Sequence, residues 1–527
     1  MSETLYENGP IITMEPEPAE AVLTRDGRIV FAGTREDARA LAAKDARRVD
    51  LDGRALLPAF IDSHGHFAGY ATSLLQARLE NAVSLEEMGE RIRAFIRENA
   101  VPAGEWVMGK GYDHNMLLPA RHPSRKWLDR VAPNHPVILQ HQSGHMGVLN
   151  TMALERLGVD EDTPSPEGGR IEKDAAGCLT GYMEENAFLQ YQKRAPMPTA
   201  DKLAGAFDRA QARYASYGIT TVQEGMLVEE LTGLYAAYLD TGRLKLDVVA
   251  YMDMASNRHI KEMFEAYMDG YRRHFRIGGY KMFLDGSPQG RTAWMRTPYT
   301  GADEQGYPVL SDEEAEARIR TALTEGRQLL THCNGDAAAA QYLSAYRRVS
   351  EGMPGHADIR PVIIHAQLLG TDQLPEVKAL GVIPSFFVAH VFHWGDVHIR
   401  NFGRERASAI SPAAAAGREG IRYTFHQDAP VIEPDMMETV WCAVNRLTGS
   451  GVCLGPEQRV PVEDALKAVT LNAAWQYFEE QEKGSIRAGK RADLVILDRD
   501  PLKVDPSALR TVRVLETVKD GETIYKA

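Results

Sequence analysis

The chain has 527 residues, which is too long for one ordinary hydrophobic core and indicates one large domain of about 250 residues or more with additions. Its formal net charge is -13 at pH 7 and no lysine- and arginine-rich run stands out, which argues against a nucleic-acid-binding surface. The four cysteines lie far apart without a Cys-x-x-Cys spacing, so neither a disulfide framework nor a cysteine-rich zinc site is indicated, and a reducing compartment fits.

Both ends of the chain have the pattern of short strands and turns. The first residues lack the basic and apolar regions of a signal peptide, and no run of about 18 apolar residues occurs, so we expect a cytoplasmic protein without membrane contact. An Asp26-Gly27 turn lies between two apolar runs near the N-terminus, and Asp520-Gly521 repeats the pattern near the C-terminus. Neither end has enough strands for a stable sheet, so residues 1–55 and 480–527 are expected to pair into one composite β-sandwich.

Residues 56–479 alternate apolar, strand-like runs with amphipathic helical stretches, the pattern of parallel β/α proteins. The predicted strands are Leu56–Ser63, Ile219–Gln223, Leu246–Met252, Gly279–Leu284, Gln328–Thr331, Val362–Ile364, Val382–Phe387 and Ile421–Phe425. Helices are predicted near 84–99, 201–217 and 312–326, the last opened by a capping box of Ser311 and Glu314. Eight strands with crossover helices predict an α/β fold, a (β/α)8 TIM-like barrel.

Metal-ligating residue types follow several of these strands. His64 and His66 end the first strand, and since residues two apart on a strand point the same way, they form half of a metal site. Active sites of barrels are built at the C-terminal ends of the strands, so we expect the residues at later strand ends to join them on one rim. These residues are Lys281, His332, His365 and Asp428.

The residue types indicate hydrolytic metal chemistry. Neutral imidazoles bind Zn²⁺ or a similar divalent ion, and a carboxylate can complete the shell while leaving a position open for water. The metal then supplies hydroxide at neutral pH, and Asp428 can take the proton of that water and pass it to the leaving group. Lys281 can bridge two ions if it adds CO₂ and becomes an N6-carboxylated lysine, so the sequence is compatible with one or two ions. The alternative role of Lys281 is a salt bridge with Asp285.

Six motifs together resemble the amidohydrolase superfamily, specifically the YtcJ-like metal-dependent hydrolases (amidohydrolase family 3), which include N-substituted formamide deformylase. The motifs are Leu57–His66, Lys281–Gly286, His332–Ala337, His365–Gln367, His426–Pro430 and Lys483–Leu494. The resemblance implies a metal-bearing barrel with a composite β-sandwich that hydrolyses C–N bonds of amide-like substrates. It also carries over His64, His66, Lys281, His332, His365 and Asp428 as the metal and catalytic set.

Two positions depart from the family pattern. Ala59 replaces a glycine that is common in the first motif, and this small change is expected to leave His64 and His66 in place. Gln427 precedes Asp428 where relatives often have serine, which alters the neighbourhood of that carboxylate. The substrate range is therefore less transferable than the metal site.

An inserted region rich in Gly, Pro and His, at about 105–195, is expected to form a lid subdomain over the barrel mouth. Its Trp106 and Tyr112 are predicted to contact the substrate. The resembling family carries a similar Gly-His followed by Asn around His145, which either acts catalytically by polarising the substrate carbonyl or makes a polar contact that shapes the lid.

Three further residues near the rim are predicted to bind substrate. Asp285 and Arg291 lie in a glycine-containing loop after the fourth strand, with Arg291 a candidate clamp for a substrate anion. His390 follows the seventh strand, as does His393, and both either face the substrate or belong to a packed aromatic wall.

The leading function is a hydrolase that cleaves an amide, formamide or related C–N bond of a small organic substrate by metal-activated hydroxide, with Asp428 as general base and acid. The alternatives are a deaminase of an amino-heterocycle on the same barrel and a non-catalytic relative that binds a small ligand. A bridging Lys281 argues against the deaminase, because a one-metal site has no use for a bridge. The expected partner is a small-molecule substrate, and a homo-oligomer stays open.

Overall fold

The chain forms two compact units in a computed structural model that describes residues 2–142, 144–196, 198–255 and 257–527. The larger unit comprises Met1–Gly69 and Ala210–Ala527, and the smaller unit is Tyr70–Arg209. Helices α2 (Phe67–Ser73) and α7 (Ala200–Ser216) span the two points at which the chain passes from one unit to the other. Within the described ranges, no helix combines the length and the apolar character needed to cross a bilayer.

An eight-stranded parallel sheet forms the centre of the larger unit, and its strands are neighbours in chain order. The strands are β6 (Phe60–Ile61), β13 (Ile219–Leu227), β14 (Asp247–Asp253), β15 (Phe275–Phe283), β16 (Gln328–Cys333), β17 (Val362–His365), β18 (Ile383–Phe386) and β19 (Thr424–Phe425). Beyond the last and first strands, the N–H of Asp428 donates to the carbonyl of His64 at 3.2 Å and the N–H of His66 donates to that of Ala429 at 2.8 Å. These bonds join the two ends of the sheet, and the predicted barrel fold is confirmed.

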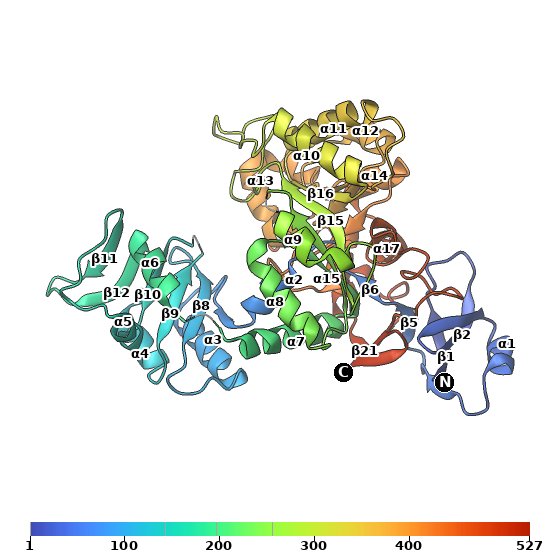
Figure 1. Cartoon of the computed structure of the whole chain (residues 1–527), viewed down its shortest axis with the longest axis horizontal. Helices are drawn as coiled ribbons and strands as arrows, with labels where there is room; N and C mark the ends of the chain where they lie inside the picture. The colour runs from blue at the N-terminus through green and yellow to red at the C-terminus, as the bar shows by residue number, and fades with distance from the viewer. Residues whose placement is uncertain (1, 143, 197, 256) are drawn as a thin grey trace. The chain divides into compact units, whose positions relative to one another are not determined.

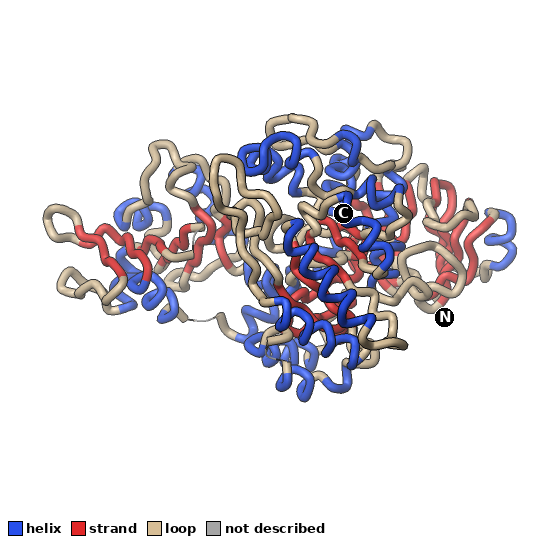
Figure 2. The backbone as a smooth tube through the Cα atoms, turned by 90° about the horizontal axis from the view of Figure 1, so that it is seen from above, coloured by secondary structure: helices blue, strands red, loops and turns tan. Residues whose placement is uncertain are grey.

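Helices alternate with the strands and border the sheet of the larger unit (Figure 2). They include α8 (Glu229–Asp240), α9 (Arg258–Met263), α10 (Asp312–Glu325), α11 (Asp336–Glu351), α12 (Leu374–Ala379), α13 (His390–Ser408), α14 (Ala413–Arg418), α15 (Met436–Asn445), α16 (Val462–Ala468) and α17 (Leu471–Gln476). The capping box that predicts the start of α10 is present: the Ser311 hydroxyl accepts from the N–H of Glu314, whose carboxylate accepts from the N–H of Ser311.

Both termini contribute strands to a second, mixed sheet of the larger unit, as their pattern of short apolar runs and turns predicts (Figure 1). Its N-terminal strands are β1 (Glu3–Ile11), β2 (Ala19–Arg25), β3 (Arg28–Gly33), β4 (Arg47–Asp50) and β5 (Ala55–Pro58), and its C-terminal strands are β20 (Leu494–Leu497), β21 (Val514–Lys519) and β22 (Glu522–Lys526). A helix, α1 (Arg35–Leu41), follows β3. The turns at Asp26-Gly27 and Asp520-Gly521 have positive φ at both residues, which suits the twist of a tight hairpin.

The apolar run that predicts the first barrel strand belongs to two sheets. Strand β5 pairs with β20 and β1 in the terminal sheet, and β6 begins the barrel only two residues later. Between them, the N–H of Ala59 donates to the carbonyl of Asp493 at 2.9 Å. A single strand over Leu56–Ser63 is therefore wrong, because the chain changes pairing partners at Ala59 without any polar residue to mark the change.

The smaller unit is a six-stranded mixed sheet with helices on both faces. In sheet order its strands are β11 (Gly169–Lys173), β12 (Leu179–Glu185), β10 (Met146–Leu149), β9 (Val137–His141), β8 (Val107–Tyr112) and β7 (Gln76–Arg78). Leu139 packs in one apolar cluster with α3 (Leu85–Glu98) and α4 (Arg125–Val131), whereas Ile138 packs in another with α5 (Thr151–Leu157) and α6 (Asn186–Arg194). Neighbouring residues of β9 thus face opposite cores. The placement of this region over the barrel mouth stays a prediction.

Candidate metal centre

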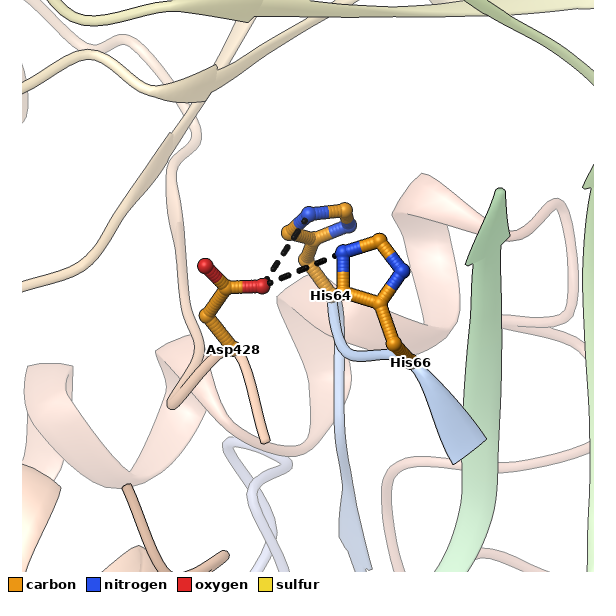
Figure 3. Close-up of side chains that lie close together, drawn as sticks. All are labelled: His64, His66 and Asp428. Atoms are coloured by element: carbon orange, nitrogen blue, oxygen red, sulfur yellow. Dashed lines mark ion pairs between the residues drawn. The ribbon is translucent and has the colours of Figure 1, made fainter. Parts of the chain in front are cut away.

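Three side chains converge where the first and last barrel strands end. The Nε2 atoms of His64 and His66 lie 3.6 Å and 3.4 Å from the same carboxylate oxygen, Oδ1 of Asp428 (Figure 3). One ligand atom from each residue lies within 4.8 Å of the others, the spacing of a group that could share one ion. Asp428 has φ 56°, a left-handed conformation that is strained for a residue with a side chain and that is held by the closing bond to His64.

The imidazole of His64 is held in one orientation from behind. Its Nδ1 lies 2.6 Å from Oε1 of Gln223, and because an amide oxygen only accepts, Nδ1 carries the hydrogen and Nε2 keeps its lone pair toward Asp428. Gly225 leaves the space that the ring occupies, since a Cβ there would lie 2.6 Å from Cε1 of His64. The Nε2 of His64 is therefore placed where it could bind a metal ion.

Lys281 and Asp428 are buried groups of opposite charge that are close enough to affect each other's pKa. Burial lowers the pKa of Lys281 to about 7 and raises the pKa of Asp428 to about 7, while each charge opposes the shift of the other. The Nζ of Lys281 lies 3.4 Å from Nε2 of His64. In the part of the chain that the structure describes, Lys281 makes no ion pair with Asp285, so the structural alternative for this lysine is not realised.

His365 and His332 complete the rim, as their strand-end positions predict. Nε2 of His365 lies 3.9 Å from Oδ2 of Asp428, and the rings of His332 and His365 contact edge to face with centroids 4.7 Å apart. Burial lowers the pKa values of His64, His66 and His365, that of His66 to about 3, with further lowering from the nearby positive charge of Lys281. These imidazoles are therefore neutral near pH 7, which is the state that binds a metal.

The surroundings of Asp428 indicate a divalent metal ion without reference to any related protein. Oδ1 of Asp428 is a buried carboxylate oxygen that has no hydrogen-bond donor among the described residues, and burying such an oxygen without a partner is costly. The imidazole nitrogens that lie 3.4 Å and 3.6 Å from it bring no positive charge in their neutral state. A cation bound between these atoms would satisfy all of them at once.

Two residues that are predicted to bind substrate have structural partners in the larger unit. The buried carboxylate of Asp285 accepts from the backbone N–H groups of Asn334 (2.9 Å), Gly335 (2.7 Å) and Trp294 (3.1 Å). Its Oδ1 also lies 3.3 Å from Nδ1 of His332, so it braces the loop beside that imidazole. Arg291 is exposed, and its Nε donates to Oδ1 of Asn401 at 3.2 Å.

The two histidines after the seventh strand contact aromatic rings, and their roles toward the substrate stay predictions. His390 is buried, with Nδ1 3.1 Å from Nε2 of His398 and ring contacts to Phe387 and Trp394 at 4.5 Å and 4.6 Å. His393 lies 3.0 Å from a carboxylate oxygen of Glu438.

The predicted lid residues lie in the smaller unit. Tyr112 is fully buried in its core, and its hydroxyl lies 3.0 Å from Nδ1 of His122. Trp106 packs against the second core of that unit. His145 is largely exposed and its Nδ1 lies 3.1 Å from Oε2 of Glu185. Their roles toward the substrate stay predictions.

Several polar residues around the centre were not singled out from the sequence. Gln223 ends the second predicted strand and Glu224 directly follows it, while His426 lies between Nδ1 of His365 (3.1 Å) and the hydroxyl of Ser385 (2.8 Å). Glu224 accepts from the N–H of Ala68 and the hydroxyl of Tyr235, and burial raises its pKa to about 7. Their positions at strand ends are the signal that could have found them.

Gln427, the departure beside Asp428, does not enter the centre. Its buried Nε2 donates to Oγ1 of Thr439 at 2.6 Å and to the carbonyl of Asp435 at 3.3 Å. Its side chain therefore connects the end of the last barrel strand to α15 and does not contribute to the candidate metal site.

The chain is similar to known proteins over nearly its whole length. A model of the amidohydrolase family matches residues 47–525. The chain is 29% identical to N-substituted formamide deformylase of Arthrobacter pascens, over 96% of this chain and 95% of that protein, and 27% identical to the putative amidohydrolase YtcJ of Bacillus subtilis, over 99% of each. Among solved structures, an uncharacterized metal-dependent hydrolase from Pyrococcus furiosus matches with a TM-score of 0.75 and 27% identity, over 95% of this chain and 100% of that one.

Proposed function

Because this chain belongs to the amidohydrolase family of metal-dependent hydrolases, we propose that it cleaves the C–N bond of a small amide, with N-substituted formamides as the first substrates to test. The observation that carries the proposal is the unpartnered Oδ1 of Asp428 facing two neutral imidazoles at the C-terminal ends of the strands. The similarity to the formamide deformylase over nearly the full length of both chains supports the choice of substrate class.

Six residues would hold the metal, and their donor atoms favour Zn²⁺. They are His64, His66, Lys281, His332, His365 and Asp428. When bound, a divalent ion lowers the pKa of a coordinated water and polarises the substrate carbonyl.

Lys281 would bind as a carbamate. Its pKa of about 7 leaves much of the amine neutral near pH 7, and a neutral amine is the form that adds CO₂. The carbamate would replace the positive charge that now faces His64 with a negative one, which favours two ions over one. The added CO₂ can be detected by native intact mass or by electron density at Nζ of Lys281. An unmodified lysine in the metal-loaded protein would contradict the carbamate.

Asp428 would move the proton of the reaction. Burial raises the pKa of its carboxyl group to about 7 in the metal-free chain, and a carboxylate in this position could take a proton from the attacking water and return it to the leaving amine. Asp428→Asn removes this capacity and is expected to lower kcat by about 10²–10⁴-fold.

The test is release of formate and amine from a panel of N-substituted formamides, with the metal removed by a chelator and then restored. Asp435→Asn is the matched control, because Asp435 is a nearby carboxylate that caps α15 and asparagine caps a helix as well. Full turnover by Asp428→Asn would refute the role of this residue. Ammonia release from aminated heterocycles would show a deaminase instead, and ligand binding by a metal-free chain without turnover would show a binding protein.

A further inference from the structure

The smaller unit carries its own group of metal-ligating side chains. Asp113 and His114 directly follow β8, and His141 is the last residue of β9. These two strands are parallel neighbours, and Tyr112 pairs with His141 in their register, so the residues after β8 meet the end of β9 at one edge of the sheet.

The three ligand atoms have the spacing of a coordination shell. Nδ1 of His114 lies 3.2 Å from Nε2 of His141, which lies 3.4 Å from Oδ1 of Asp113, and the third side of this triangle is 3.8 Å. Ligands held about 2.0–2.2 Å from a tetrahedral ion lie about 3.3–3.6 Å from each other. The group therefore needs only small movements to bind one ion.

Hydrogen bonding can make both contacts of His141 only if one N–H on its Nε2 is shared between Oδ1 of Asp113 and a lone pair on Nδ1 of His114. The 3.8 Å separation of His114 from Asp113 is then left without a hydrogen bond. A cation between the three atoms makes all three contacts favourable.

Neighbouring groups already hold the ligands in place. The N–H and the side-chain amide of Asn115 donate to Oδ1 of Asp113 at 2.9 Å and 3.1 Å, and Nε2 of Gln142 donates to Oδ2 at 2.6 Å. The ring of His122 stacks on that of His114 with centroids 4.0 Å apart. Such an outer shell orients metal ligands and strengthens binding.

We propose that Asp113, His114 and His141 bind one divalent transition-metal ion, with Zn²⁺ the ion that fits best. Two imidazoles and one carboxylate favour Zn²⁺ over Mg²⁺ or Ca²⁺, which take oxygen ligands. Three protein ligands leave a fourth position for water, and Asp113 and His114 are open enough to solvent to admit it. The ion would tie the segment after β8 to the end of β9.

The first test is the number of Zn²⁺ ions that the full chain binds at equilibrium. His114→Ala is expected to bind one ion fewer than the wild type, and Gln142→Ala is expected to bind that ion about 10–100-fold more weakly. Both variants keep the barrel residues, so the difference does not depend on whether the barrel binds metal. His259→Ala, which removes an exposed imidazole from the larger unit, is the control and should change nothing.

The second test needs no variant. Crystals of the wild-type chain equilibrated with Zn²⁺ should show an anomalous peak between the three side chains at the zinc edge. No peak at that position, or equal ion counts for the wild type and His114→Ala, would show a hydrogen-bonded cluster only and would overturn the proposal.

Discussion

Replacing Gln223 by methionine separates the orientation of His64 from its presence. The two side chains have similar length, but methionine supplies no amide oxygen to accept from Nδ1 of His64, a contact that is 2.6 Å in the wild type. The ring then loses the bond that fixes its tautomer and directs Nε2 toward Asp428.

The hydrogen bonds around Gln223 indicate how much stability and metal affinity the substitution should cost. Nε2 of Gln223 also donates to the carbonyl of Ser63 and the hydroxyl of Tyr477, but each of these keeps another bond: Ser63 accepts from Gln476 at 2.9 Å, and Tyr477 donates to Asp62 at 2.7 Å. Only the buried N–H of His64 is left without an acceptor, at a cost of about 1–3 kcal/mol in the metal-free chain. Loss of such an orienting group weakens metal binding by about 10–100-fold.

Metal affinity by competition with a chromophoric chelator, and unfolding in urea without metal, measure the two effects separately. Gln476→Met is the matched control, because this buried glutamine bonds the same carbonyl of Ser63 and the hydroxyl of Thr424 but does not contact His64. It should destabilise the chain and leave the metal affinity unchanged. Equal affinities of the wild type and Gln223→Met would refute the argument that Gln223 orients the ligand.

Two further predictions concern buried carboxyl groups near the centre. Burial raises the pKa of Glu224 from its usual 4.5 to about 7, so the folded metal-free chain binds the proton more tightly than the unfolded chain and loses stability as the pH rises from 4.5 to 7. The free energy of unfolding should fall by on the order of 3 kcal/mol over this pH range. Urea unfolding of Glu224→Gln across the same range should not show this fall. Parallel pH profiles of the two proteins would contradict the prediction. Asp285→Asn leaves one acceptor oxygen for the N–H groups that two carboxylate oxygens now bind, so its unfolding free energy should fall by about 1–3 kcal/mol, and a variant as stable as the wild type would show that Asp285 does not brace the loop.

The barrel and the position of its centre could be predicted because local patterns specify them. Apolar runs separated by amphipathic helices predict parallel strands, and a polar side chain directly after each run must lie at one end of the barrel. This reasoning brings Lys281, His332 and His365 to the same rim as His64, where the structure has them.

The features that could not be predicted depend on residues far apart in the chain. The change of partners at Ala59 is set by Asp493, more than 400 positions away, and no local pattern reports such a pairing. For Gln223 and Glu224 the sequence carries only a weak signal, their position at a strand end, because an amide or a single carboxyl there has no distinctive spacing and its contacts appear only in the folded chain.

The split of the first apolar run between two sheets has a consequence for synthesis. His64 and His66 leave the ribosome early, but β5, the strand that leads into them, pairs with β20 near the other end of the chain. Until residues 494–497 have been translated, β5 lacks this neighbour, and Ala59 lacks the carbonyl of Asp493. We therefore expect the two histidines to gain this support only when translation is nearly complete, and a chain that stops before β20 contains the six proposed ligands without the β5–β20 pairing.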